Sequence, residues 1–449
     1  MNKSVSQYDK MTKTPVSTLI IKLSIPTIIS MLVTNIYNLA DTAFVGQLGN
    51  SASGAVGVVF GFMAILQALG FMFGNGSGSI ISRMLGNKDT ENASKIASTG
   101  FFSALTSGVL VSVLSFIFLN PLVMFLGSTT TIAPYAQTYI SFILFAAPFM
   151  TTSFLMNNIL RYEGKATLGM IGLLIGAVLN IIGDPIFMFV LNMGIAGAGL
   201  STALSQVISF SVLLSMFLRG KTVTKFSFKL ISRNYKDFLN ILATGLPSLL
   251  RQGLNSITTV LLNNYAAVYG DEAVAAMSIV SRVIFFTFSI ALGVGQGFQP
   301  VCGFNYGAKK YGRLRQAFTF TFVLAEIVVV IMAIPLLIFS NGIIGVFRDD
   351  LRVIEIGTRT LILQGISQLF LPFCMTCEML LQSTGKRLYA SLLSAVRNGL
   401  FFVPSLIVLA NLRGLSGIQE AQPLAVALAF IPSVFFAVDF FRKLPRSNA

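Results

Sequence analysis

Four polar side chains in the first half of the chain have types and spacings that suit the binding of a proton or a small hard cation: Asp41, Asn180, Asp184 and Thr202. All four lie in apolar segments, where an ionised Asp costs roughly 3 kcal/mol, so each carboxylate must face protein or water. Asn180 and Asp184 are one helical turn apart and share a face. Two close carboxylates share a proton because both cannot ionise freely. The alternative is that Asp41 only caps a helix at the membrane interface.

The composition identifies the elements that must position these residues as membrane helices. The chain has 449 residues, of which 54% are hydrophobic and 10% charged, with a mean hydropathy of +0.80. Soluble proteins carry about 25% charged residues. Because His is absent, the commonest general base is missing, and we predict no enzyme activity. Cys302, Cys374 and Cys377 all lie in apolar segments, where we expect buried thiols and no redox site.

Twelve apolar segments have lengths close to the 20 or so residues that cross a bilayer. They are 18–46, 53–81, 96–120, 133–157, 167–191, 195–218, 239–268, 273–302, 316–340, 353–380, 388–410 and 417–441. Most Lys and Arg residues gather on one side of these segments, and only Arg348, Arg352, Arg359 and Arg413 lie on the other. The positive-inside rule then predicts that both termini are cytoplasmic. The formal charge of +15 therefore reflects topology, and we expect no nucleic-acid partner.

An internal repeat at an offset of 221 residues divides the chain in two. Matched positions include Pro26 and Pro247, Gly49 and Gly270, Gly74 and Gly295, Gly76 and Gly297, Lys88 and Lys309, and Gly164 and Gly385. Such positions carry backbone geometry, so the repeat predicts two bundles of six helices. We place a first lobe at 1–218, a basic cytoplasmic linker at 219–237 and a second lobe at 238–449. Six is even, so both lobes run the same way through the membrane, and such parallel repeats are a known architecture of transporters.

The repeat does not reproduce the polar set of the first lobe. Asp41 matches Leu262, Asn180 matches Phe401 and Asp184 matches Ser405. The bundle therefore does not need these residues to fold, which favours a dedicated role. At 1.5 Å per residue, the predicted topology places all four polar residues about 8–12 Å below the outer surface.

Other residues allow two interpretations. Pro185 has no N–H, so the carbonyl of Ile181 loses its usual donor and becomes either an extra ligand or part of a simple kink. The second half has buried charges of its own, to which the sequence assigns no role: Arg251, Arg282, Glu326, Glu378 and Arg397. Depth suggests that Arg251, Arg397 and Glu326 meet. We favour paired structural charges over a second ion site.

Several motifs together resemble the multidrug and toxic compound extrusion (MATE) transporters. The stretch from Leu39 to Gly49, LADTAFVGQLG, is similar to the family's first-helix signature. The other matching stretches are 76–89 after the second segment, LRYEGK at 160–165, NIIGDP at 180–185 and GIAGAGL at 194–200. The resemblance covers nearly the whole chain, including both repeats.

The resemblance implies an antiporter that exports lipophilic organic cations, often aromatic drugs, in exchange for H+ or Na+ by alternating access. The positions matching Asp41, Asn180, Asp184 and Thr202 form the ion-coupling site in similar bacterial members, and the first helix can bend at Pro26. We add Pro185 as a conformational residue. We assign substrate binding to Tyr37, Asn157 and Gln206. Some members use acidic residues of helices seven and ten for Na+, a pattern from which this sequence departs.

The sequence therefore predicts an all-α, multi-pass protein of the bacterial cytoplasmic membrane. Its expected partners are small organic cations and membrane lipid. We expect no cofactor and no metal beyond the coupling ion. A monomer is expected, although no sequence feature determines the oligomeric state, the substrate or the choice between H+ and Na+. The alternatives are a lipid or lipid-linked oligosaccharide flippase of the same superfamily and, from another class, an intramembrane enzyme.

Overall fold

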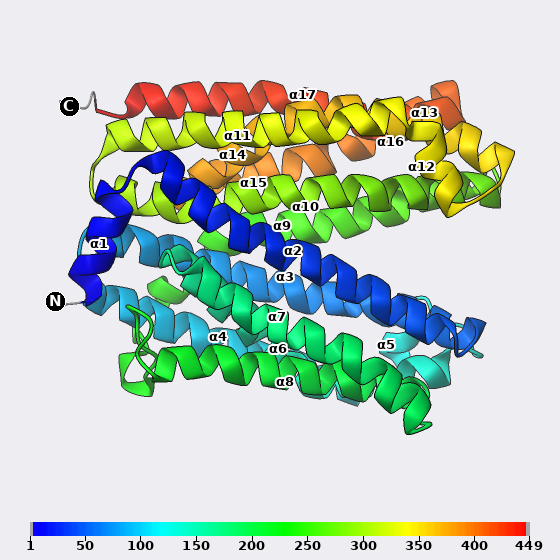
Figure 1. Cartoon of the computed structure of the whole chain (residues 1–449), viewed down its shortest axis with the longest axis horizontal. Helices are drawn as coiled ribbons and strands as arrows, with labels where there is room; N and C mark the ends of the chain where they lie inside the picture. Colours follow the sequence, from blue (N-terminus) through cyan, green and yellow to red (C-terminus); the bar gives the residue numbers. More distant parts are fainter. Residues whose placement is uncertain (1–2, 446–449) are drawn as a thin grey trace. The chain divides into compact units, whose positions relative to one another are not determined.

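The computed structural model of the chain describes residues 3–445, with side chains from Gln7 onward, and contains no β-strand within that range. The first half of the chain forms eight α-helices and one π-helix (Figure 1). They are α1 (Lys3–Lys13), α2 (Val16–Gly46), α3 (Asn50–Gly86), α4 (Thr90–Ile117), α5 (Leu119–Phe125), α6 (Ala133–Tyr162), α7 (Ala166–Pro185), η1 (Ile186–Val190) and α8 (Ile195–Leu218).

The second half repeats this order after a short 3-10 turn, η2 (Phe228–Leu230). Its elements are α9 (Tyr235–Ala267), α10 (Asp271–Gly307), α11 (Tyr311–Ile338), α12 (Ser340–Phe347), α13 (Leu351–Ser367), η3 (Gln368–Phe370), α14 (Leu371–Ser383), α15 (Arg387–Ala395), η4 (Val396–Leu400), α16 (Phe402–Arg413) and α17 (Leu415–Lys443). The prediction of an all-α membrane protein with two repeated bundles is confirmed. The side of the membrane on which the termini lie stays a prediction.

Eleven helical stretches of the described chain are long and apolar enough to cross a membrane. The helix at the remaining predicted segment, α9, is 33 residues long but is not among them. It carries Arg251, Gln252 and Asn255 within its length, which lower its hydropathy. A polar helix of this length is stable in a bilayer only where its polar face meets protein or water.

The repeat is visible in the backbone as well as in the sequence. Left-handed φ angles recur at the offset of 221: +110° and +100° at Gly49 and Gly270, +62° and +59° at Lys88 and Lys309, and +77° and +82° at Gly164 and Gly385. Positive φ is uncommon for residues with a side chain, so two lysines that share it at matched turns indicate a common loop geometry. At these three turns the two halves therefore have the same loop geometry, whereas Gly127 at +99° corresponds to an extended Arg348 at −155°.

Contacts divide the chain into two compact units, and the division falls inside two helices. Unit 1 consists of residues 1–13 and 29–249, and unit 2 of residues 14–28 and 250–449. The first part of α2 thus packs in unit 2, and the first part of α9 packs in unit 1. Pro26 and Pro247 each lie two residues before the point where the helix changes unit. Each unit has its own apolar core. The lobe boundaries drawn from the repeat stay a prediction.

The exchanged helix segments approach their neighbours at glycines. In unit 1, a Cβ on Gly245 of α9 would lie 1.9 Å from the carbonyl oxygen of Met72 on α3. In unit 2, a Cβ on Gly297 of α10 would lie 2.7 Å from the backbone nitrogen of Ser24 on α2. These crossings are matched by the repeat, since Ser24 corresponds to Gly245 and Gly297 to Gly76, where a Cβ would lie 3.1 Å from the backbone nitrogen of Gly245. Small residues at such crossings let membrane helices pack backbone to backbone.

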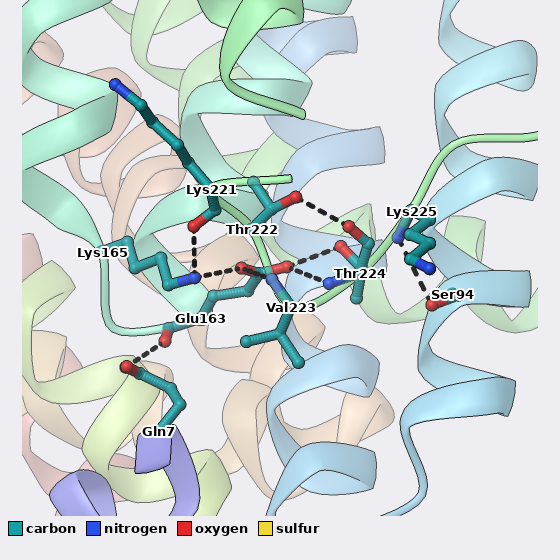
Figure 2. Close-up of polar contacts among 9 residues, drawn as sticks. All are labelled: Gln7, Ser94, Glu163, Lys165, Lys221, Thr222, Val223, Thr224 and Lys225. Atoms are coloured by element: carbon teal, nitrogen blue, oxygen red, sulfur yellow. Dashed lines mark hydrogen bonds and ion pairs between the residues drawn. The ribbon is translucent and has the colours of Figure 1, made fainter. Parts of the chain in front are cut away.

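The linker between the two halves is docked on unit 1 through Glu163, which follows α6 and is fully buried (Figure 2). Its carboxylate accepts hydrogen bonds from the backbone of Val223 at 2.8 Å and of Thr224 at 2.9 Å, and from the Thr224 hydroxyl at 2.6 Å. Lys165 Nζ lies 3.8 Å from the same carboxylate. Gln7 of α1 donates to the Glu163 carbonyl at 2.6 Å. One residue thereby ties the N-terminal helix and the linker to the end of α6.

Burial raises the pKa of Glu163 above the ordinary Glu range, and Lys165 and the hydrogen bonds to Thr224 and Val223 oppose that rise. The linker also packs through aromatic contacts. Phe226 stacks between Phe101 and Phe217, with ring centroids 4.5 and 4.1 Å away. The linker is therefore an ordered part of unit 1.

Candidate functional site

Unit 1 brings together the side chains of Asn180, Asp184 and Thr202. Asn180 Nδ2 donates to Asp184 Oδ1 at 3.1 Å, one turn along α7, and to Thr202 Oγ1 of α8 at 3.1 Å. All three residues are buried, and Asp184 is 0% exposed. The amide therefore links the acid of one helix to the hydroxyl of the next.

Asp41 of α2 joins this group through Tyr139, a residue that the sequence reasoning missed. Tyr139 of α6 donates from its hydroxyl to Asp41 Oδ2 at 3.1 Å, and the same hydroxyl interacts with Thr202. Asp184 is within electrostatic range of Asp41. The repeat contained the missing signal, since Tyr139 corresponds at the offset of 221 to Thr360, as unlike a match as Asp41 and Leu262.

Close packing between α7 and α8 fixes the positions of these groups. A Cβ on Gly183 would lie 2.5 Å from Ser201 Oγ, and that hydroxyl donates to the Asn180 carbonyl at 3.3 Å. α7 ends at Pro185, and the π-helix η1 follows it directly. Gly197 of α8 lies against the backbone of Phe187 in η1, where a Cβ would come within 2.6 Å. The small residues at these contacts allow the polar groups of the two helices to reach each other.

Three buried oxygens of the group have no hydrogen-bond partner: Asp41 Oδ1, Asn180 Oδ1 and Asp184 Oδ2. Among the side chains described, from residue 7 to 445, no Lys or Arg forms an ion pair with either aspartate. Buried acceptors without donors are unfavourable, and each normally has an explanation. A proton or a small cation would satisfy them, because both supply positive charge to oxygens. The described chain has no group of three His, Cys, Asp or Glu residues that could hold a metal ion.

A narrow cleft of about 20 Å³, roughly the space of one water molecule, lies beside this group. Its lining includes Asn180 and Thr202, together with two of the predicted substrate-binding residues, Tyr37 and Gln206. The third, Asn157, is not part of that lining and packs against Gly169, where a Cβ would lie 2.7 Å from Asn157 Nδ2. Assignment of these three residues to a substrate stays a prediction.

The buried charges of unit 2 pair differently from the depth estimate. Arg251 Nη1 donates to Glu378 Oε1 at 2.6 Å, whereas Glu326 forms no ion pair in the described chain and keeps Oε2 without a partner. An Arg side chain spans more than a turn of helix, so depths counted along the backbone do not decide its partner. Arg282 is exposed on α10. The three cysteines are buried and form no disulfide, as expected.

Comparison with known proteins matches the chain to one family model twice. The MatE model covers residues 26–186 and 247–407. Both ends of the second match lie 221 residues after those of the first, which is the offset of the repeat. Together the two matches cover more than half of the chain.

Curated relatives and solved structures agree with that match. The multidrug export protein MepA of Staphylococcus aureus strain N315 is 28% identical over 430 residues, covering 94% of this chain and 93% of the relative. MepA of Staphylococcus saprophyticus is 29% identical, covering 88% and 87%. A MATE structure in complex with MaL6 has 25% identity and a TM-score of 0.92, covering 99% of both chains. A MOP superfamily transporter from Pyrococcus furiosus has the same identity, TM-score and coverage.

Proposed function

Since this chain belongs to the MatE family of multidrug efflux transporters, we propose that it exports lipophilic organic cations in exchange for H+ or Na+. In this proposal Asp41, Asn180, Asp184 and Thr202 bind the coupling ion, and Tyr37 and Gln206 contact the exported compound. The chain is a multi-pass bacterial membrane protein, as its relatives and apolar helices indicate.

The observation that carries the proposal is the set of three unpartnered buried oxygens on Asp41, Asn180 and Asp184. A structural polar cluster would normally be complete, with each acceptor facing a donor. Here the Asn180 amide and the Tyr139 hydroxyl each donate to one carboxylate, and the Ser201 hydroxyl interacts with Asp184 as well. Asp41 Oδ1 and Asp184 Oδ2 still have no hydrogen-bond partner. These unpartnered oxygens suit an ion that binds and dissociates during each transport cycle.

The transport cycle follows from charge. With both aspartates ionised, the cleft beside them attracts a lipophilic cation, because an uncompensated carboxylate in low dielectric is costly. Loading of H+ or Na+ from outside neutralises the carboxylates and removes that attraction, so the cation is released. Alternating access then returns the loaded site to the cytoplasm, where the ion dissociates. Exchange is obligatory because the same carboxylates serve both ligands.

The test is efflux of a fluorescent organic cation from proteoliposomes, with a pH gradient and a Na+ gradient imposed separately. Asp41→Asn and Asp184→Asn should each abolish gradient-driven efflux and leave membrane insertion intact. Asp439→Asn is the matched control, because Asp439 forms an exposed i,i+4 ion pair with Lys443 on α17. Normal efflux by either site variant would overturn the coupling assignment. Hydrolytic or transferase activity without transport would favour the enzyme alternative.

A further inference from the structure

Unit 2 contains a buried group of charges that the proposed function does not use. Its first members are Arg251 of α9 and Glu378 of α14, whose side chains are 5% and 4% exposed and meet at 2.6 Å. Charges inside a membrane protein are rare and are normally paired, because an isolated one is expensive. This pair by itself is neutral and satisfies that rule.

A second guanidinium makes the group cationic. Arg397 of η4 is 8% exposed and within electrostatic range of both Glu378 and Arg251. It lies over the ring of Phe288, 5.5 Å from the centroid, and Nε donates to Asn398 Oδ1 at 3.2 Å. No ion pair of the described chain includes Arg397. Two guanidinium groups and one carboxylate leave a formal charge of +1 among apolar helices.

The neighbouring residue adds a second donor without an acceptor. Asn398 Nδ2 is buried and has no hydrogen-bond partner. Arg397 donates only through Nε within the described chain, and its Nη atoms, which are not among the fully buried unpartnered atoms, remain available to a further acceptor. Buried polar groups are nearly always satisfied, so the unpartnered Asn398 amide beside these Nη atoms and an excess positive charge indicates a missing anion.

The backbone that carries these donors departs from the repeat. The π-helix of the first half begins at Ile186, which corresponds at the offset of 221 to position 407. The π-helix of the second half begins at Val396 instead and contains both Arg397 and Asn398. π-helical turns are rare and frequently occur at functional sites. In the second half the π-helical turn therefore coincides with the available donors of Arg397 and Asn398.

The surroundings favour an organic anion over a hydrated inorganic one. Phe288 covers one face of the guanidinium, and Leu254 lies beside Gly399, where a Cβ would be 3.3 Å from Leu254 Cδ1. Val396 packs in a small apolar cluster with Cys374. A second cation site is disfavoured, since two guanidinium groups would repel the ion. The planar fork of Arg matches the two oxygens of a carboxylate.

We propose that Arg397 and Asn398 form a binding site for the carboxylate of a small organic compound, either a free carboxylate or the acidic group of a zwitterion. Arg397 donates to the carboxylate through its free Nη groups, and Asn398 Nδ2 donates to it as well. Glu378 stays paired with Arg251 and keeps the excess charge at a single guanidinium. This site lies entirely within unit 2, so it does not rest on the coupling residues of unit 1.

The test is equilibrium binding, which is independent of coupling and transport. The purified full chain is placed in lipid nanodiscs and titrated against a rhodamine dye with a free carboxyl group, followed by fluorescence polarisation. The methyl ester of the same dye is the matched probe, because it differs only in the carboxylate. Arg397→Gln should weaken binding of the acid by roughly tenfold or more, the range for a charged hydrogen bond, and change binding of the ester little. Benzoate should displace the acid from the wild type.

Further variants separate binding from folding. Arg397→Lys keeps the charge without the fork and should lose most of the acid binding. Asn398→Leu keeps the guanidinium and should weaken binding of the acid dye but not of the ester. This variant tests the proposal if Arg397→Gln does not fold. Arg359→Gln is the control, since Arg359 is 53% exposed and pairs with Glu420. Equal loss of acid and ester, no loss in the folded Arg397 and Asn398 variants, or failure of benzoate to compete would each overturn the proposal.

Discussion

The tight crossing of α2 and α10 in unit 2 predicts a loss of stability when Gly297 is changed to Ala. The added Cβ would lie 2.7 Å from the nitrogen and 2.8 Å from the Cα of Ser24, both backbone atoms. Ordinary contact begins at 3.4 Å, so α2 must move away from α10 by about 0.7 Å. That shift also strains the bond from Ser24 Oγ to the Val294 carbonyl, which is already 3.3 Å long.

The expected size follows from three effects. Overpacking a tight contact costs about 1–3 kcal/mol. Loss of the Ser24 hydrogen bond adds about 1 kcal/mol, and the better helix propensity of Ala returns about 1 kcal/mol. The net destabilisation is about 1–3 kcal/mol. Gly253→Ala is the matched control, because Gly253 lies inside α9 with nothing within 4 Å of its would-be Cβ. It should gain up to about 1 kcal/mol.

The chain supplies its own reporters for the assay. The thiols of Cys302, Cys374 and Cys377 are buried in unit 2 and form no disulfide, so a fluorogenic thiol reagent reacts only as this unit opens on heating. Unfolding of membrane proteins is commonly irreversible, so all variants are heated at one rate. Each kcal/mol should shift the transition by about 2–4 °C for a unit of this size. A Gly297→Ala protein that unfolds at or above the wild-type temperature would refute the tight crossing.

Two further predictions concern buried charges. Burial raises the pKa of Glu163, so the folded protein holds this proton more tightly than the unfolded chain does. The resulting stabilisation of the docked linker is complete below the ordinary Glu pKa. It is lost as the pH rises through the raised pKa. Hydrogen exchange at Val223 and Thr224 should therefore increase with pH beyond its intrinsic rate, and equal profiles for wild type and Glu163→Gln would contradict this. Glu378→Gln leaves Arg251 buried without its carboxylate and should cost about 3–5 kcal/mol in the thiol assay. Changing both residues to Met should restore most of the loss, and a fully stable single variant would contradict the pairing.

Much of the fold was predictable because it depends on features that a sequence displays directly. Apolar length predicts the helices, and glycines and prolines at a constant offset predict the duplication. The same comparison between halves singled out Asp41, Asn180 and Asp184 as residues that the scaffold does not need. The structure brings Asn180 and Asp184 into contact with each other and links Asp41 to them through Tyr139.

Features that depend on how helices rotate and cross were not predictable. Depth along a helix does not give the direction of a side chain, so Tyr139 was missed and Arg251 was placed near Glu326 instead of Glu378. The exchange of helix segments between units is also invisible in the sequence, because a repeat shows which segments correspond and not which ones pack together. Pro26 and Pro247 would match in the sequence whether or not the helix segments were exchanged between the units.

The exchanged segments of α2 and α9 also bear on how the duplication arose. Each six-helix half is completed by a helical segment that belongs, in sequence, to the other half. In a protein with a single copy of the repeat and the same packing, the first helical segment would not pack in the bundle formed by the rest of the chain. Two such copies could exchange their first segments, so that each bundle is completed by the segment of the other copy. This exchange is domain swapping between identical subunits.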